Sequence, residues 1–168
     1  LDYLILGYAS PSLIDLLLQN GADPKTDRSL RNASLRGDPA LVEKLLALGV
    51  DPNRRGPDGS TALWSASTSG FYSWGNRQTS TIDNYVRCVR LLLQHGAKVD
   101  VAITDSEGLL WLLVRSFWKD ERLKLILVEL IPYSSKSAIN SAYDLSVKFG
   151  NSQGSSDLSA WLGQFVRP

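Results

Sequence analysis

Apolar residues recur along this chain at helical spacing, in stripes that end at a glycine. The clearest stripe follows the i, i+3, i+4 pattern of an amphipathic helix and consists of Leu41, Val42, Leu45 and Leu46. Gly49 follows it, at the place where a helix commonly ends in a left-handed conformation that penalises a side chain. The pattern therefore predicts a helix that ends just before Gly49.

A shorter stripe precedes this one. Leu30, Ala33 and Ser34 face one way on a predicted helix that ends at Gly37-Asp38-Pro39. Proline cannot continue that helix but suits the first turn of the next one. The segment therefore predicts two helices joined by a tight turn.

The same helix ending occurs three times. A leucine-rich stretch runs into Gly-x-Asp or Gly-x-Lys at residues 16–23, 45–51 and 91–98. Self-similarity at a spacing of a few dozen residues indicates one supersecondary unit that is copied and stacked. Because such a unit cannot bury its apolar face alone, neighbouring copies must complete each other's core, which predicts a solenoid.

The stretch from Gly49 to Ala66 carries the most specific pattern. It reads G-V-D-P-N-R-R-G-P-D-G-S-T-A-L-W-S-A and resembles the ankyrin-repeat pattern G-A-D-V-N-x-x-D-x-x-G-x-T-P-L-H-x-A-A. Elementary chemistry agrees with the resemblance. Asp58-Gly59 suits a turn between repeats, Thr61 is able to cap the next helix with its hydroxyl, and Ala66 is small where two helices must approach closely.

The resemblance implies an all-α fold, an α-solenoid of ankyrin-type helix-turn-helix repeats with short β-hairpin or turn fingers between them. We expect one domain over 1–168. Its five repeats, with degenerate end copies, are expected at 1–23, 24–53, 54–100, 101–132 and 133–168. Because the chain begins within a repeat, we expect it to be a fragment of a longer protein.

The third repeat contains an insertion of roughly fourteen residues at 71–84. Phe71, Tyr72 and Trp74 lie at its start, and aromatic side chains argue against full disorder because they favour burial. The inserted loop either folds back over its own helices or offers an apolar patch to a partner. Both interpretations stay open.

Charge and composition narrow the range of partners. Lys and Arg number 18 against 17 for Asp and Glu, a net charge of +1, so no strong field favours nucleic acid or an anionic membrane. No apolar run is long enough to cross a bilayer. A single cysteine excludes an intrachain disulfide framework and favours an intracellular location, cytoplasmic or nuclear. We expect the isolated domain to be a monomer.

No pattern predicts catalysis, a metal or a cofactor. Residues 150–154 match G-x-S-x-G, but a nucleophile elbow needs a preceding strand and a downstream histidine. A helical pattern precedes this segment, and His95, the one histidine, lies upstream, so a polar loop between two helices is expected. Cys88 lies on an apolar helix face, where a buried and inert thiol is expected. The chain is therefore predicted not to be an enzyme.

The resemblance implies that a ligand contacts the finger tips and the inner helices on the concave face. These positions are Arg31, Arg36, Arg54, Arg55, Asp58, Ser60, Trp64, Thr68, Ser69, Ser106, Glu107 and Trp111, and the insertion adds Phe71, Tyr72 and Trp74. Any single arginine is better explained as a solvated surface residue. Trp64 replaces the histidine of the pattern, and we expect it to pack between finger and helix; the alternative is a binding hot spot.

The predicted function is recognition of a partner protein or peptide. One alternative is a regulatory or targeting segment of a larger multidomain enzyme or signalling protein, and another is a structural spacer. A third is a reader of methylated lysine, because Trp64 and Trp111 with Asp58 and Glu107 supply the aromatic faces and carboxylates that suit an alkylated ammonium.

Overall fold

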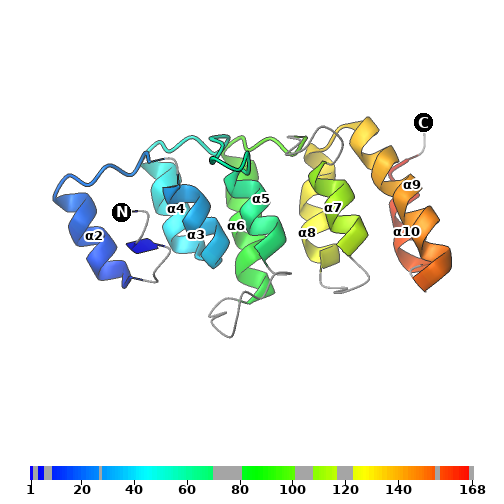
Figure 1. Ribbon diagram of the computed structural model, residues 1–168, viewed down its shortest axis with the longest axis horizontal. Coiled ribbons are helices and arrows are strands. Elements are labelled where there is room, and N and C mark those ends of the chain that lie inside the picture. Colours follow the sequence, from blue (N-terminus) through cyan, green and yellow to red (C-terminus); the bar gives the residue numbers. More distant parts are fainter. Residues whose placement is uncertain are drawn as a thin grey trace. The chain divides into compact units, whose positions relative to one another are not determined.

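Short helices joined by turns make up the computed structural model of this chain (Figure 1). The structure describes residues 1, 4–5, 9–26, 28–69, 81–100, 108–116, 123–153 and 156–166. They fall in two compact units, Leu1–Lys98 and Val99–Pro168. Within these described ranges no residue belongs to a strand, which confirms the all-α fold.

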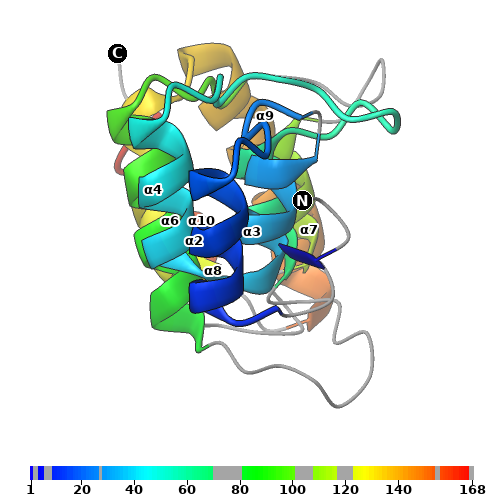
Figure 2. The ribbon, with the colours of Figure 1, turned by 90° about the vertical axis from the view of Figure 1, so that its left-hand side faces the viewer.

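The first unit consists of helical pairs. Helix α2 (Pro11–Gln19) precedes the pairs α3 (Ser29–Arg36) with α4 (Pro39–Ala47), and α5 (Ala62–Ser69) with α6 (Ile82–Gln94). The members of each pair lie side by side, α3 packs on α5, and α4 packs on α6 (Figures 1 and 2). The shared core contains Ala33, Val42, Leu45, Leu63, Ala66, Val89 and Leu92, each less than 2% exposed. Each pair thus buries its apolar face against its neighbour, as the repeat pattern predicts.

Polar side chains and prolines start these helices. The Ser10 and Asp38 side chains accept hydrogen bonds from the backbone N–H of Leu13 (3.3 Å) and Leu41 (3.1 Å). A proline in the first turn follows each cap, where its missing N–H costs nothing. Thr61 Oγ1 accepts from the Trp64 N–H at 3.2 Å, which confirms its predicted role as a cap.

Glycines in the left-handed backbone conformation end these helices. Gly21, Gly49 and Gly96 have φ of 86°, 77° and 83°, and each follows a leucine-rich helix end. A residue with a Cβ would be strained there. The repeated Gly-x-Asp/Lys ending is therefore a set of helix stops, as predicted.

Asn53 joins successive repeats of the first unit. Its side-chain Nδ2 donates to the Gly96 carbonyl at 2.9 Å, and its Oδ1 accepts from the Lys98 N–H at 2.8 Å. One amide thus satisfies two backbone groups just after the end of α6, which would otherwise lack an intrahelical partner.

The second unit has the same plan. It contains α7 (Leu109–Ser116), α8 (Leu123–Leu130), the 3-10 turn η2 (Ile131–Tyr133), α9 (Lys136–Gln153) and α10 (Ser156–Leu162). Helix α9 packs on both α7 and α10, and α8 contacts α7. Asp100 Oδ2 accepts from the Ser135 N–H at 2.9 Å, so a side chain again holds the start of the next repeat.

Two boundaries differ from the sequence-based prediction. Helix α9 continues through residues 150–153, so the polar loop predicted at 150–154 is wrong: each added residue contributes one backbone hydrogen bond to an existing helix, and no proline interrupts the segment. Helix α6 begins at Ile82, so residues 82–84 of the predicted insertion are helical. Phe165 lies beyond α10 and packs edge-to-face on Trp161, with ring centroids 5.2 Å apart.

Two buried serine hydroxyls lack a hydrogen-bond partner. Ser34 in α3 and Ser67 in α5 are both fully buried, and neither Oγ has a partner among the described residues. They hold the same position in successive inner helices. A buried hydroxyl without a partner costs free energy that a methyl group of similar size does not.

We therefore expect Ser67→Ala to leave the free energy of unfolding unchanged or to raise it by up to about 1 kcal/mol. The matched control is Ser69→Ala, because the Ser69 hydroxyl donates to the Ser65 carbonyl and its removal should cost about 1 kcal/mol. Urea unfolding followed by circular dichroism measures both. A loss of more than about 1 kcal/mol in Ser67→Ala would show that this hydroxyl has a partner.

Candidate functional site

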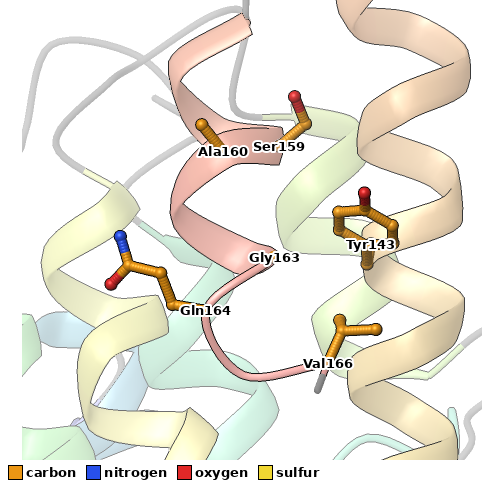
Figure 3. A pocket seen from close by; sticks show the side chains of 6 residues that line it. All are labelled: Tyr143, Ser159, Ala160, Gly163, Gln164 and Val166. Atoms are coloured by element: carbon orange, nitrogen blue, oxygen red, sulfur yellow. The ribbon is translucent and has the colours of Figure 1, made fainter.

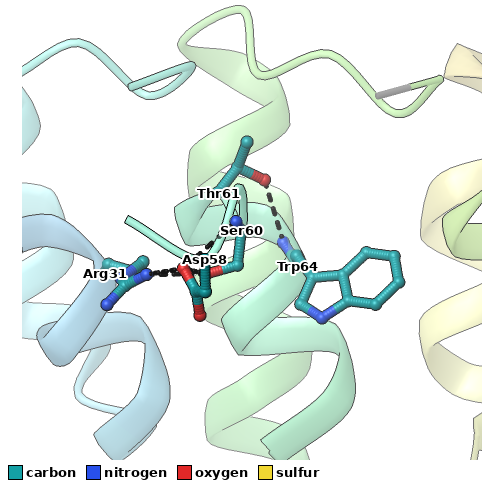
Figure 4. A network of polar contacts seen from close by, with 5 residues as sticks. All are labelled: Arg31, Asp58, Ser60, Thr61 and Trp64. Carbon is teal, nitrogen blue, oxygen red and sulfur yellow. Dashed lines mark hydrogen bonds and ion pairs between the residues drawn. The ribbon is translucent and has the colours of Figure 1, made fainter. Parts of the chain in front are cut away.

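The finger between α4 and α5 is held to α3 by an arginine. Arg31 Nη1 donates to Ser60 Oγ at 2.8 Å and pairs with the Asp58 carboxylate (Figure 4). The Ser60 hydroxyl in turn donates to Asp58 Oδ1 at 2.8 Å. The Arg31 side chain is only 17% exposed, so this cluster fixes the finger to the preceding repeat.

Gly56 makes room for this contact. A Cβ on Gly56 would lie 1.8 Å from Arg31 Nη1 and 2.4 Å from its Cζ, so a larger residue here would require the guanidinium to move away from the finger. The Gly56 N–H also donates to the Ser60 carbonyl at 2.8 Å, and Gly59, at φ 76°, completes the turn. The guanidinium therefore packs directly against the finger backbone.

The cluster also sets the charge state of Asp58. Partial burial raises the pKa of this carboxyl, but the hydrogen bonds from Ser60 and the positive charge of Arg31 outweigh it. The pKa of Asp58 therefore lies below its usual value of 3.8. The ion pair is complete at neutral pH.

Two other arginines of the predicted site also bind backbone groups of neighbouring segments. Arg36 Nη1 donates to the Ile5 carbonyl at 2.9 Å, and Arg36 Nη2 lies 3.6 Å from Asp38 Oδ2. Arg54 Nη1 donates to the Lys25 carbonyl at 2.9 Å, which links two successive fingers. Arg36 and Arg54 therefore stabilise the fold through these contacts. Arg55 is exposed on the finger.

Trp64 is the one residue of helix α5 that is not buried. The other seven residues of this helix are buried. Thr68 and Ser69, which the sequence placed on the binding face, are 6% and 7% exposed, and their hydroxyls bond back to the carbonyls of Trp64 (2.8 Å) and Ser65. Burial leaves Thr68 and Ser69 little surface for a partner.

The Trp64 indole is half-buried and points away from the Arg31 cluster (Figure 4). It is therefore intermediate between the fully packed residue that we expected and a fully exposed one. Its backbone N–H is bonded to Thr61, which fixes where the side chain leaves the helix.

In the second unit a pocket of about 220 Å³ lies beside α7 and α9. Trp111, half-buried at the equivalent position of α7, forms part of its wall. The remaining lining residues are Val99, Asp100, Gly108, Leu109, Leu110, Ser135, Ser137, Ala138 and Ser141. Arg115 covers the Trp111 ring, with its Cζ 5.1 Å from the ring centroid.

A wider hollow of about 690 Å³ lies between α9 and α10 (Figure 3). Tyr143, Gln164 and Val166 line it together with Ser159, Ala160 and Gly163. A Cβ on Gly163 would come within 3.4 Å of the Tyr143 ring, so glycine allows this close approach. None of the described residues that line it is charged.

Some predicted site residues lie outside the described residues: Phe71, Tyr72, Trp74, Ser106 and Glu107. Their roles stay predictions. Trp64 belongs to the first unit and Trp111 to the second, so the methyl-lysine cage that would need both also stays a prediction.

The residues with catalytic potential are isolated. His95 caps α6 on the surface, with Nδ1 2.9 Å from the Leu91 carbonyl oxygen. Cys88 is fully buried in α6, and burial, with a smaller contribution from Asp38, raises the pKa of its thiol to about 12. Among the described residues no three His, Cys, Asp or Glu side chains gather in a way that would hold a metal ion.

Comparison with known proteins shows which family model part of this chain matches. Residues 58–106 match the family model described as Ankyrin repeat. This segment of the chain is ankyrin-repeat sequence. The matched range is longer than the ~33 residues of one ankyrin repeat, and it includes Asp58, Ser60, Trp64 and the whole of the predicted insertion. Ankyrin repeats are generally protein-interaction modules.

The chain is also similar to part of a much longer protein. Cortactin-binding protein 2 of Oryctolagus cuniculus is 36% identical over 96 residues, and the proteins of that name from Mus musculus and Equus caballus give the same identity and length. The similarity covers 55% of this chain, and the chain spans about 5% of the length of these relatives.

None of the described ankyrin-repeat helices has the length and apolar character required to span a membrane. The intracellular location stays a prediction from the sequence.

The lowered pKa of Asp58 makes stability depend on pH. A carboxyl whose folded pKa lies below its unfolded pKa stabilises the fold above the unfolded value and loses that contribution as the pH falls through the folded one. We expect Asp58→Asn to lower the free energy of unfolding above pH 3.8, by no more than about 1 kcal/mol because the carboxylate is largely exposed.

The difference between the Asp58→Asn variant and the original chain should shrink as the pH falls below 3.8. Urea unfolding over a range of pH measures it, with the exposed Glu43→Gln as a control for general charge effects. A difference that does not depend on pH would contradict the assignment of the lowered pKa to Asp58.

The buried thiol gives a second prediction. With a pKa of about 12, roughly one Cys88 side chain in ten thousand is ionised near pH 8, and the thiolate is the reactive form. We expect a thiol reagent to modify the native chain only at the rate at which the first unit opens. Mass spectrometry across a urea series tests this, and fast modification without urea would contradict it.

Proposed function

We propose that this chain binds a partner protein or peptide through its inner helices and fingers. The observation that carries the proposal is the half-buried tryptophan at the same position of two inner helices, Trp64 in α5 and Trp111 in α7. A large aromatic ring that keeps part of its surface accessible supplies apolar contact area at low conformational cost. Such residues dominate the binding energy of many protein interfaces.

The finger supports the same proposal. Binding loses affinity when a loop must be ordered on contact. The bonds from Arg31 to Asp58 and Ser60 hold the finger before any partner arrives. A partner that contacts Arg55 and Trp64 would therefore meet a preorganised surface.

The name of the relatives suggests a first partner to test. Those proteins are named for binding cortactin, and this chain corresponds to about 5% of their length. Cortactin is accordingly one candidate among protein partners. The contribution of the inserted loop at 71–84 stays a prediction.

The test compares tryptophan variants with matched surface controls. Trp64→Ala and Trp111→Ala each remove an aromatic ring from an inner helix, whereas Leu48→Ala and Val128→Ala shorten side chains that are 43% and 48% exposed elsewhere. We expect a tryptophan variant to bind a partner about 30-fold more weakly, the effect of losing a hot spot, and the controls to bind normally.

Calorimetry measures the affinity of each of the four variants for purified cortactin and for proteins that the chain captures from a lysate. Circular dichroism confirms that each variant is folded. The proposed surface would be refuted if Leu48→Ala or Val128→Ala weakened the binding of a partner while Trp64→Ala and Trp111→Ala both left its affinity unchanged.

A further inference from the structure

The pocket beside α7 and α9 has one charged residue in its wall. Among the described lining residues, Asp100 is the one with a formal charge, and three serines, Ser135, Ser137 and Ser141, supply the other polar side chains. The remaining wall is formed by aliphatic residues and Trp111. The pocket therefore combines apolar sides with one negative end.

The hydrogen bond that the Asp100 side chain makes does not depend on its negative charge. Four residues after the stop glycine of its repeat, Asn53 holds the same position and accepts from the Lys98 N–H through an amide oxygen. Asp100 performs this task through Oδ2, which accepts from the Ser135 N–H at 2.9 Å. An asparagine would keep this hydrogen bond, so the bond itself does not require the charge, although a carboxylate is also favoured by the dipole at the N-terminal end of α9.

No ion pair neutralises Asp100 within the part of the chain that the structure describes. The three ion pairs between described residues are Arg31 with Asp58, Arg36 with Asp38 and Lys44 with Asp15. Lys136, which lies between the lining residues Ser135 and Ser137, is exposed and belongs to none of them. The charge of Asp100 is thus available to a cation.

The size of the pocket limits the occupant. Sites for whole small molecules commonly enclose about 300–1,000 Å³, and this pocket encloses about 220 Å³. A single side chain of a bound polypeptide suits this volume. Lysine and arginine have an apolar stem for the Trp111 and Leu109 side of the wall and a cationic head for the carboxylate.

Building on the proposed function, we propose that this pocket binds a lysine or arginine side chain of the partner. The charged head lies against Asp100 and the serine hydroxyls, and the stem lies along the apolar wall. Arg115 already lies over the Trp111 ring, so attraction to the ring is secondary and Asp100 supplies the selectivity. The charge at this one position then decides which residue the partner presents.

Selection from a display library of random 12-residue peptides tests this on the full chain, with Asp100→Asn, Asp100→Lys and Trp111→Ala as variants. Asp100→Asn keeps an oxygen for the Ser135 N–H and removes only the charge. We expect peptides selected on the original chain to share a lysine or arginine. Changing it to glutamine in the peptide should weaken binding at least tenfold to the original chain and less than twofold to Asp100→Asn.

Asp100→Lys should reverse the preference toward aspartate or glutamate, because like charges in the pocket repel. If Asp100→Lys does not fold, the comparison with Asp100→Asn still decides the outcome. Peptides that depend on Trp111 but show no basic residue, or that keep an equal basic preference on Asp100→Asn, would overturn the pocket assignment alone. Selected peptides whose binding is unaffected by Trp111→Ala would overturn the proposed binding surface in this unit as well.

Discussion

The helices of this chain are too short to be stable by themselves, and everything else in the structure follows from that. Helices α3, α5, α7 and α8 have eight residues each, below the roughly twelve to fifteen that an isolated helix needs to be even marginal in water. Their stability therefore comes from packing against neighbours. Small residues such as Ala33 and Ala66 let the inner helices approach closely, and the resulting order holds Trp64 and the finger at fixed positions.

Packing alone does not set the spacing between repeats, because apolar contacts have little directional preference. Side chains that bind groups of a neighbouring repeat supply the direction. Asn53 and Asp100 do this from the start of each finger, and Arg31 and Arg54 do it from a helix and a finger. The surface proposed for binding thus consists partly of the residues that keep the repeats in register.

Local signals in the sequence predicted the local structure. The hydroxyl of Thr61 and the left-handed glycines act within a few residues of their own position, so a pattern of residue types suffices to find them. Contacts between repeats were not predictable in the same way. The burial of Thr68 and Ser69 depends on how closely neighbouring elements pack, and the ion pair of Arg31 with Asp58 joins residues 27 positions apart. The role of Asp100 emerged only when the pocket wall and the equivalence with Asn53 were both known.

Gly56 has a consequence for anyone who would engineer this chain. The absence of a side chain leaves room for the Arg31 guanidinium, so a larger residue at this position would have to move the guanidinium away from Asp58 and Ser60 and would weaken the contact between finger and helix. Arg55 and Pro57 on either side are exposed and accept variation. A useful library would diversify those two positions and keep the glycine constant.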